Sequence, residues 1–156
     1  MILPSIILDD MVLPQEKKRE MILQILFALS LEEQNKESLI PLMMNELKST
    51  KKCVSEAFCQ AEVIYAKREE IDSAIEQFSH SYRLERIHKV ERTVLRLCCY
   101  ELLFEKELPP SVVISEAIRL TKKFSTSDGA RFVHAILDGV SKRALLTDDS
   151  VFLSKE

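Results

Sequence analysis

Two groups of basic residues, one of them next to an aromatic ring, are the part of this sequence that most clearly suggests a chemical role. One group reads Lys17, Lys18, Arg19, and a later one reads Lys122, Lys123, Phe124. Cations pair with phosphates, and a ring can stack on an unpaired base, which contributes about 1–3 kcal/mol per base. Lysines at the end of a helix are also favoured by the helix dipole. The residues alone leave two interpretations open, a surface for single-stranded nucleic acid and a solvated helix end.

The net charge confines any such surface to part of the chain. The 156 residues carry 22 Lys and Arg against 25 Asp and Glu, a formal net charge of −3. A protein that bound nucleic acid over its whole surface would be basic overall. Between residues 115 and 143, however, six cations face only three carboxylates. The positive charge is therefore concentrated late in the chain.

Enzyme chemistry finds little support in the sequence. The histidines, His80, His88 and His134, have no Ser, Cys or metal-ligand constellation near them in sequence. Only two glycines occur, so the chain has neither a phosphate-cradling loop nor a dinucleotide fingerprint. We therefore expect a protein that is not an enzyme and that uses no cofactor and no metal.

The cysteines and the first residues indicate where the protein works. Cys53, Cys59, Cys98 and Cys99 lie in apolar helical stretches and lack CxxC or Cys/His spacing. We expect reduced core residues of a cytoplasmic protein. The opening segment, residues 1–14, is apolar but has no basic start and contains two prolines and two aspartates, so it is neither a signal peptide nor a membrane span.

Glu101 is the one acidic residue whose position raises a question. It follows Val94 and Leu97 at helical spacing and so borders the most apolar stripe of the chain. An unpaired carboxylate would be costly there. It either pairs with an arginine, such as Arg96 or Arg92, or contacts a partner, and the spacing does not decide between them.

These residues must be positioned by helices, because apolar residues recur at three- and four-residue intervals and no segment alternates with period two. We predict an all-α domain of about seven helices, with Pro41 in a first turn and "STSDGA" separating the last two. We expect the chain to consist of a leader (1–14), a helical domain (15–144) and an acidic tail (145–156). The leader should pack on the domain. The first helix opens with Lys17, Lys18 and Arg19 and runs to about Leu29. The others cover approximately residues 39–47, 54–65, 71–78, 90–104, 114–124 and 131–140.

Four motifs occur in order and carry a family resemblance. They are R-E-x(3)-Q-x-L from Arg19, R-x(3)-V-E-R-x(2)-L-R-L-x(2)-Y-E-L from Arg86, P-x(2)-V-x-I-x-E-A from Pro109, and F-V-x(2)-I-L-D from Phe132. From about Lys17 to Arg143 the chain resembles the NusB family of bacterial transcription antitermination factors.

That resemblance implies a fold and a function. The fold would be two three-helix bundles around a long central helix. The protein would bind the small-subunit ribosomal protein NusE, and the pair would bind boxA-type single-stranded RNA within an antitermination complex with RNA polymerase, supporting ribosomal RNA transcription without catalysis.

Specific residues follow from the resemblance and from the basic pattern together. Lys17, Lys18, Arg19, Asp128, Arg131 and Phe132 match family positions that meet RNA, and Lys122 and Lys123 would supply a rim of that surface. Tyr82, Glu85, Arg86 and Glu91 match the region that docks NusE.

Two alternatives stay open, and the first is suggested by Gln15 and Glu16, which precede only three cations where the family commonly has an arginine-rich run. The chain could be a helical protein-interaction module that keeps the NusE contact with weak RNA binding. It could also form a homodimer that masks the RNA surface.

Overall fold

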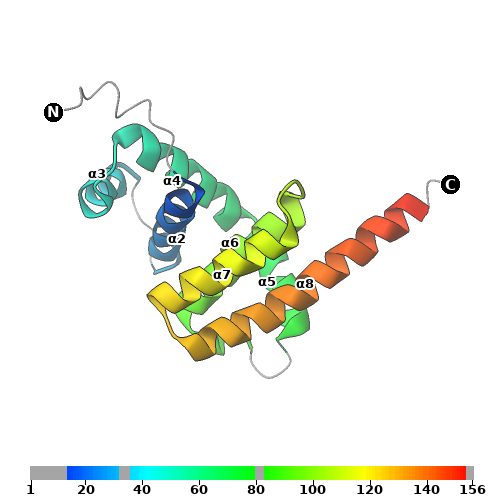
Figure 1. The fold of residues 1–156 in the computed structure, drawn as a ribbon. Coiled ribbons are helices and arrows are strands. Elements are labelled where there is room, and N and C mark those ends of the chain that lie inside the picture. The colour runs from blue at the N-terminus through cyan, green and yellow to red at the C-terminus, as the bar shows by residue number, and fades with distance from the viewer. Residues whose placement is uncertain (1–13, 32–35, 80–82, 154–156) are drawn as a thin grey trace. The chain divides into compact units, whose positions relative to one another are not determined.

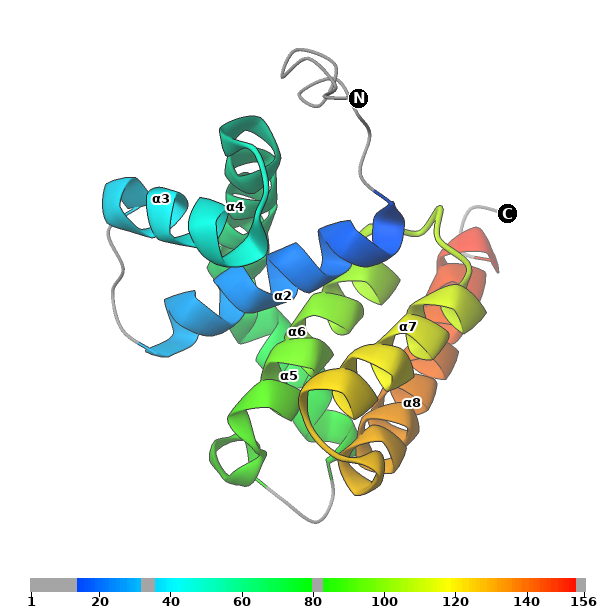
Figure 2. The same ribbon diagram turned by 60° about the vertical axis from the view of Figure 1, so that its left-hand side comes forward.

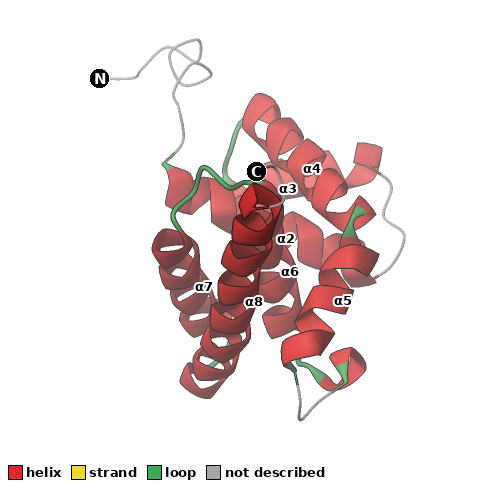
Figure 3. Ribbon diagram, turned by 90° about the vertical axis from the view of Figure 1, so that its right-hand side faces the viewer, coloured by secondary structure: helices red, strands yellow, loops and turns green. Residues whose placement is uncertain are grey.

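A computed structural model describes the backbone of residues 14–31, 36–79 and 83–153, and side chains as far as residue 146. Within these ranges every regular element is a helix: seven α-helices and one short 3-10 helix (Figure 3). The predicted all-α class is confirmed. The leader expected to pack on the domain lies outside the described residues.

The chain divides into two compact units, and the first ends at Ala66. It contains α2 (Gln15–Leu31), α3 (Lys36–Leu47) and α4 (Lys51–Ala66), which form a three-helix unit (Figure 1). α4 packs against both α2 and α3. Its apolar side recurs every three or four residues, so Val54, Phe58 and Ala61 are all buried.

α3 differs from its prediction at Pro41. The helix begins at Lys36, so Pro41 is its sixth residue and lies beyond the first turn. A proline there cannot donate a hydrogen bond to the carbonyl of Glu37. Pro41 is solvent-exposed, so the disruption falls on the outer side of α3, where packing is not disturbed.

The second unit begins at Lys67 and holds the longer helices. α6, α7 and α8 pack against one another pairwise, and α5 lies against α6 and α8 (Figures 1 and 2). The elements are α5 (Arg68–Phe78), the 3-10 helix η1 (Leu84–Arg86), α6 (Lys89–Phe104), α7 (Pro110–Phe124) and α8 (Ser127–Leu153).

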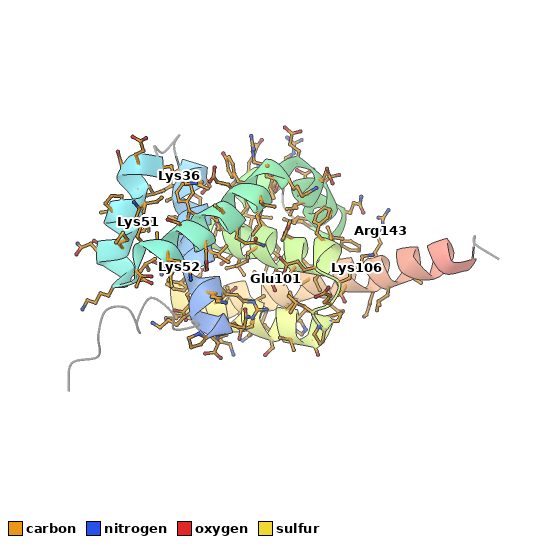
Figure 4. All side chains as sticks on the ribbon, turned by 90° about the horizontal axis from the view of Figure 1, so that it is seen from above. Lys36, Lys51, Lys52, Glu101, Lys106 and Arg143 are labelled. Atoms are coloured by element: carbon orange, nitrogen blue, oxygen red, sulfur yellow. The ribbon has the colours of Figure 1, made fainter. Side chains whose placement is uncertain are left out.

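α6 is buried along most of its length, as its apolar sequence predicts. Arg96 is held by a two-point ion pair: its Nε and Nη2 donate to Oδ1 and Oδ2 of Asp72 on α5, each at 2.8 Å. This geometry suits a guanidinium and a carboxylate away from bulk water. Arg96, offered by the sequence as a partner of Glu101, thus ties α6 to α5. Glu101, labelled in Figure 4, is only 5% exposed.

α8 begins earlier than the "STSDGA" prediction allowed. Thr126 caps it: the Thr126 Oγ1 accepts a hydrogen bond from the amide of Gly129 at 2.9 Å, and the Thr126 carbonyl accepts one from Ala130 at 3.0 Å. Thr is a favoured N-cap residue because its hydroxyl serves an amide that has no intrahelical partner. Asp128 and Gly129 therefore belong to the helix, which continues to Leu153.

Candidate nucleic-acid interface

The connection between α7 and α8 gathers five of the eight residues predicted to bind RNA. α7 ends at Phe124 and α8 begins at Ser127, so only two residues separate the helices. The end of α7 and the start of α8 therefore lie at the same end of the second unit (Figure 2). We call this group the α7–α8 cluster; it consists of Lys122, Lys123, Asp128, Arg131 and Phe132.

The cations of the α7–α8 cluster are accessible to a ligand. Lys122, Lys123 and Arg131 are exposed. Arg131 forms an ion pair with Asp128, but its Nη1 lies 3.9 Å from Oδ1, and the two side chains are 83% and 91% exposed. A solvated pair at that distance contributes little to stability. The guanidinium can therefore exchange Asp128 for a phosphate at small cost.

Two rings accompany these cations. Phe124 and Phe132 are both half-buried. The Nζ of Lys123 lies 5.6 Å from the centre of the Phe124 ring, within the range of a cation–π contact. Part of each residue is therefore accessible to a ligand.

Glu91 on α6 contacts the α7–α8 connection. Its Oε1 accepts a hydrogen bond from the Ser125 hydroxyl at 3.1 Å. The same carboxylate occupies the space where a side chain on Gly129 would begin: a Cβ built there would lie 2.1 Å from Oε1 and 2.7 Å from Cδ. Glu91, predicted as a partner-binding residue, therefore also contacts the backbone that carries the α7–α8 cluster.

The three cations at the start of α2 differ in their surroundings. Lys17 is exposed, Lys18 is half-buried, and Arg19 is only 7% exposed. Successive helical residues are rotated by about 100°, so neighbouring residues of α2 point in different directions. The burial of Arg19 argues against a direct phosphate contact. That Lys17 and Lys18 share one surface with the α7–α8 cluster stays a prediction.

Two of the four predicted partner-binding residues lie in η1. Glu85 and Arg86 are exposed on this single turn, which is closed by hydrogen bonds from the Arg86 amide to the Arg83 carbonyl and from the Ile87 amide to the Leu84 carbonyl. Tyr82 lies outside the described residues. Glu85 and Arg86 thus expose opposite charges on one short element.

Three residues that hold the connection in place were not predicted from the sequence: Ser125, Thr126 and Gly129. A signal for one of them was present, because a threonine just before Ser-Asp-Gly-Ala is a helix-start pattern. No sequence signal could have found the contact of Glu91 with Ser125 and Gly129, since it joins residues more than thirty positions apart.

The cysteines correct one expectation. Cys98 and Cys99 are buried as predicted, but Cys53 is half-buried and Cys59 is exposed, so two of the four lie outside the core; all four are free thiols. Burial raises the pKa of the Cys99 thiol far above its ordinary range, and the nearby Asp72 carboxylate raises it further. Cys99 is therefore held as a neutral thiol.

Neither a metal centre nor a membrane-spanning helix is present among the described residues. Among these residues, no three His, Cys, Asp or Glu side chains come together in a way that could hold a metal ion. No helix in the described part of the chain combines the length and the apolar character needed to cross a membrane.

Solved structures of similar fold include molecules with RNA. NusB from T. maritima superposes with a TM-score of 0.71 at 32% identity, covering 85% of this chain and 93% of that one. A crystal structure of the antitermination factors NusB and NusE in complex with double-stranded RNA contains a chain with a TM-score of 0.71 at 27% identity, covering 83% and 96%. A crystal structure of a plectonemic RNA supercoil contains another, with a TM-score of 0.74 at 26% identity, covering 84% and 96%.

Two relatives that are similar in sequence are both transcription antitermination proteins NusB. The transcription antitermination protein NusB of Chlamydia pneumoniae is 36% identical over 138 residues, covering 88% of this chain and 86% of its own length. That of Dehalococcoides mccartyi strain CBDB1 is 31% identical over 128 residues, covering 82% and 90%. The NusB family model matches residues 16–142. Because the family model and these relatives match most of the chain, the chain belongs to the NusB family.

Proposed function

We propose that the chain is a transcription antitermination factor that binds boxA-type single-stranded RNA together with the ribosomal protein NusE and so supports ribosomal RNA transcription. The observation that carries the proposal is the α7–α8 cluster, where exposed cations and a half-buried ring gather in a member of the NusB family. The protein would act in the bacterial cytoplasm, catalyse no reaction and need no cofactor.

The RNA surface would be built on the helical domain, residues 15–144, between the leader and the acidic tail. Lys122, Lys123 and Arg131 would pair with phosphates, and Phe132 would stack on a base. Asp128 would accept a hydrogen bond from the amino group of a base. Arg131 would then leave its ion pair with Asp128 and bind a phosphate of the RNA backbone.

The start of α2 would supply further RNA contacts. Lys17 and Lys18 would add phosphate contacts, and Arg19, being buried, would support the helix they stand on. Each additional phosphate contact would steepen the dependence of affinity on salt.

Single-stranded RNA fits these residues better than a duplex. The solved relative described above holds double-stranded RNA beside NusB and NusE. Stacking on Phe132 requires a base released from its neighbours, which a regular duplex does not offer. A duplex of the same length is therefore the matched competitor in any binding test.

The partner surface would be centred on η1. Glu85 and Arg86 would form charged contacts with NusE, with Tyr82 and Glu91 beside them. Exposed charges of both signs within three residues favour a partner that also carries both signs, because a like charge facing either one would be repelled.

The test is fluorescence anisotropy of a labelled boxA-like RNA with the purified chain, alone and with NusE, across a series of salt concentrations. We expect salt-sensitive binding that NusE strengthens and that an unlabelled duplex competes poorly. Binding that is absent in both conditions, with NusE still captured, would overturn the RNA part of the proposal.

The interaction-module alternative is favoured by one observation. Exposed Gln15 and Glu16 precede Lys17, and Arg19 is buried, so the start of α2 offers few accessible cations. Capture of NusE without measurable RNA affinity would support this module. Light scattering at several ionic strengths would reveal a homodimer, the other alternative.

A further inference from the structure

Glu91 lies where two predicted surfaces adjoin. It is the third residue of α6 and follows η1 by a few positions, so by sequence it belongs with the partner-binding residues. Its carboxylate, however, contacts the α7–α8 connection through Ser125 and Gly129. A side chain that belongs by sequence with the partner-binding residues therefore contacts the segment that carries the α7–α8 cluster.

The contact holds the backbone on two sides. On one side Oε1 accepts the Ser125 hydroxyl at 3.1 Å, where α7 has just ended. On the other side the carboxylate lies against the Cα of Gly129, in the first turn of α8, where a Cβ would meet Oε1 at 2.1 Å. The end of α7 and the start of α8 are thus fixed to the same group on α6.

Gly129 is needed for this arrangement. Glycine in a helix costs about 1 kcal/mol relative to alanine. Alanine at position 129 would keep the Thr126 cap, which uses only the backbone amide. It would nevertheless push the Glu91 carboxylate away. The absence of a side chain at position 129 thus leaves the space that the Glu91 carboxylate occupies.

We infer that Glu91 is a positioning residue for RNA binding: by holding Ser125 and Gly129 it fixes the α7–α8 cluster in the orientation that meets RNA, whether or not a protein partner is bound. This inference rests on the proposed function. It differs from a role as a partner contact alone, because Glu91 would then matter for RNA affinity in the absence of NusE.

The experiment pairs two measurements on the full chain. Hydrogen exchange of the amides of residues 125–131 reports the order of the connection without any RNA, and anisotropy with a labelled boxA-like RNA, without NusE, reports affinity. For Glu91→Ala we expect faster exchange at Gly129 and Ala130 and an RNA affinity lower by about 3- to 10-fold, the effect of losing one hydrogen bond.

Two further variants test the contact of Glu91 with Ser125 and Gly129, one by changing residue 91 and the other by changing residue 129. Glu91→Gln keeps an acceptor of the same size for Ser125, so it should restore most of the affinity and the slow exchange. Gly129→Ala should reproduce the RNA defect of Glu91→Ala, and the combined variant should be little worse than either one, because both remove the same contact.

The outcomes separate the inference from the proposed function. If the native chain binds no RNA but Glu91→Ala still accelerates exchange in the connection, positioning by Glu91 stands and the RNA function fails. If the native chain binds RNA and Glu91→Ala changes neither exchange nor affinity while weakening only NusE capture, the inference is overturned and Glu91 is a partner contact.

Discussion

Phe132 shows how one side chain can serve both packing and recognition. It is half-buried at the start of α8 and follows the exposed Arg131. A ring held in this way keeps a fixed orientation, and a base that stacks on it does not have to order it first. The flanking cation adds attraction for the phosphate of the same nucleotide.

Replacing Phe132 by Ala should therefore lower RNA affinity by about 1–3 kcal/mol, the range measured for the loss of a base-stacking ring. Capture of NusE should be unchanged, and Phe132→Tyr should bind RNA nearly as well as the native chain. Anisotropy and pull-down measure the two affinities. If Phe132→Ala unfolds the protein instead, the ring belongs to the core and does not stack on a base.

Cys99 gives a prediction about pH. Its pKa is raised by burial, so the folded state keeps the proton when the unfolded thiol loses it near pH 8.5. Above that pH the unfolded state binds fewer protons than the folded state, and the free energy of unfolding falls as pH rises.

Urea unfolding of the native chain and of Cys99→Ala at pH 7.5 and pH 9.5 measures this effect. The stability advantage of the native chain over the variant should shrink by about 1.4 kcal/mol between the two values. An advantage that stays constant would mean that the Cys99 thiol ionises as readily in the folded protein as in the unfolded one.

At the scale of the elements, helix ends are set by local hydrogen bonds. Thr50 caps α4 by accepting the Cys53 amide at 3.2 Å, as Thr126 caps α8. α3 ends with the Ser49 amide bonded to the Met44 carbonyl at 3.2 Å, and Lys48 between them has a φ of 48°. This left-handed conformation suits glycine and is strained for lysine.

Lys48→Gly should therefore stabilise the protein by about 0.5–1 kcal/mol, because glycine adopts a positive φ without a steric penalty. Lys52→Gly, the same substitution inside the first turn of α4, should destabilise it by a similar amount. Thermal unfolding of both variants checks the contrast. Equal effects of the two changes would show that the end of α3 is not limited by the conformation of Lys48.

The helices were predictable where a single stripe of apolar residues dominates. α6 was found because Val94, Leu97 and Cys98 repeat at helical spacing, and all three are buried. The start of α8 was misplaced because Asp-Gly looks like a turn. Tertiary contact with Glu91 is what makes glycine suitable there.

The site was predictable only as a list of residue types. The α7–α8 cluster came from cations and rings close in sequence, and the structure keeps them together. Arg19 could not be told from Lys17, because the sequence gives each the same charge and the folded chain buries only one. The role of Glu91 depends on which carboxylate reaches the connection, and that is decided by the packing of α6 against α7 and α8.

For the whole molecule, the distribution of charged residues matters more for RNA binding than the net charge does. A net charge of −3 repels RNA weakly at long range, so binding must depend on the few cations that reach phosphates. Lys122 and Lys142 allow this to be tested, because both are exposed, but Lys142 lies outside the α7–α8 cluster and pairs with Asp138 at 2.9 Å.

Lys122→Gln should weaken RNA binding and reduce the log-log salt slope by about 0.7, one phosphate contact on a single strand. Lys142→Gln changes the net charge equally but should leave the slope unchanged. Anisotropy at a series of salt concentrations measures both. Equal shifts for the two variants would indicate attraction by the overall field of the protein.

The only two glycines of the chain both lie in α8, at positions 129 and 139. The first faces Glu91 of α6, and the second faces Phe78 of α5, where a Cβ would lie 2.5 Å from the ring. Both glycines leave room for side chains of neighbouring helices, so they add to the buried apolar residues of α8 in setting its register. A shift by one residue would oppose Ala130 and Val140, or Asp128 and Asp138, to these two side chains. A one-residue deletion in the α7–α8 connection should thus be tolerated far less well than the same deletion near Leu153, where α8 has passed both contacts.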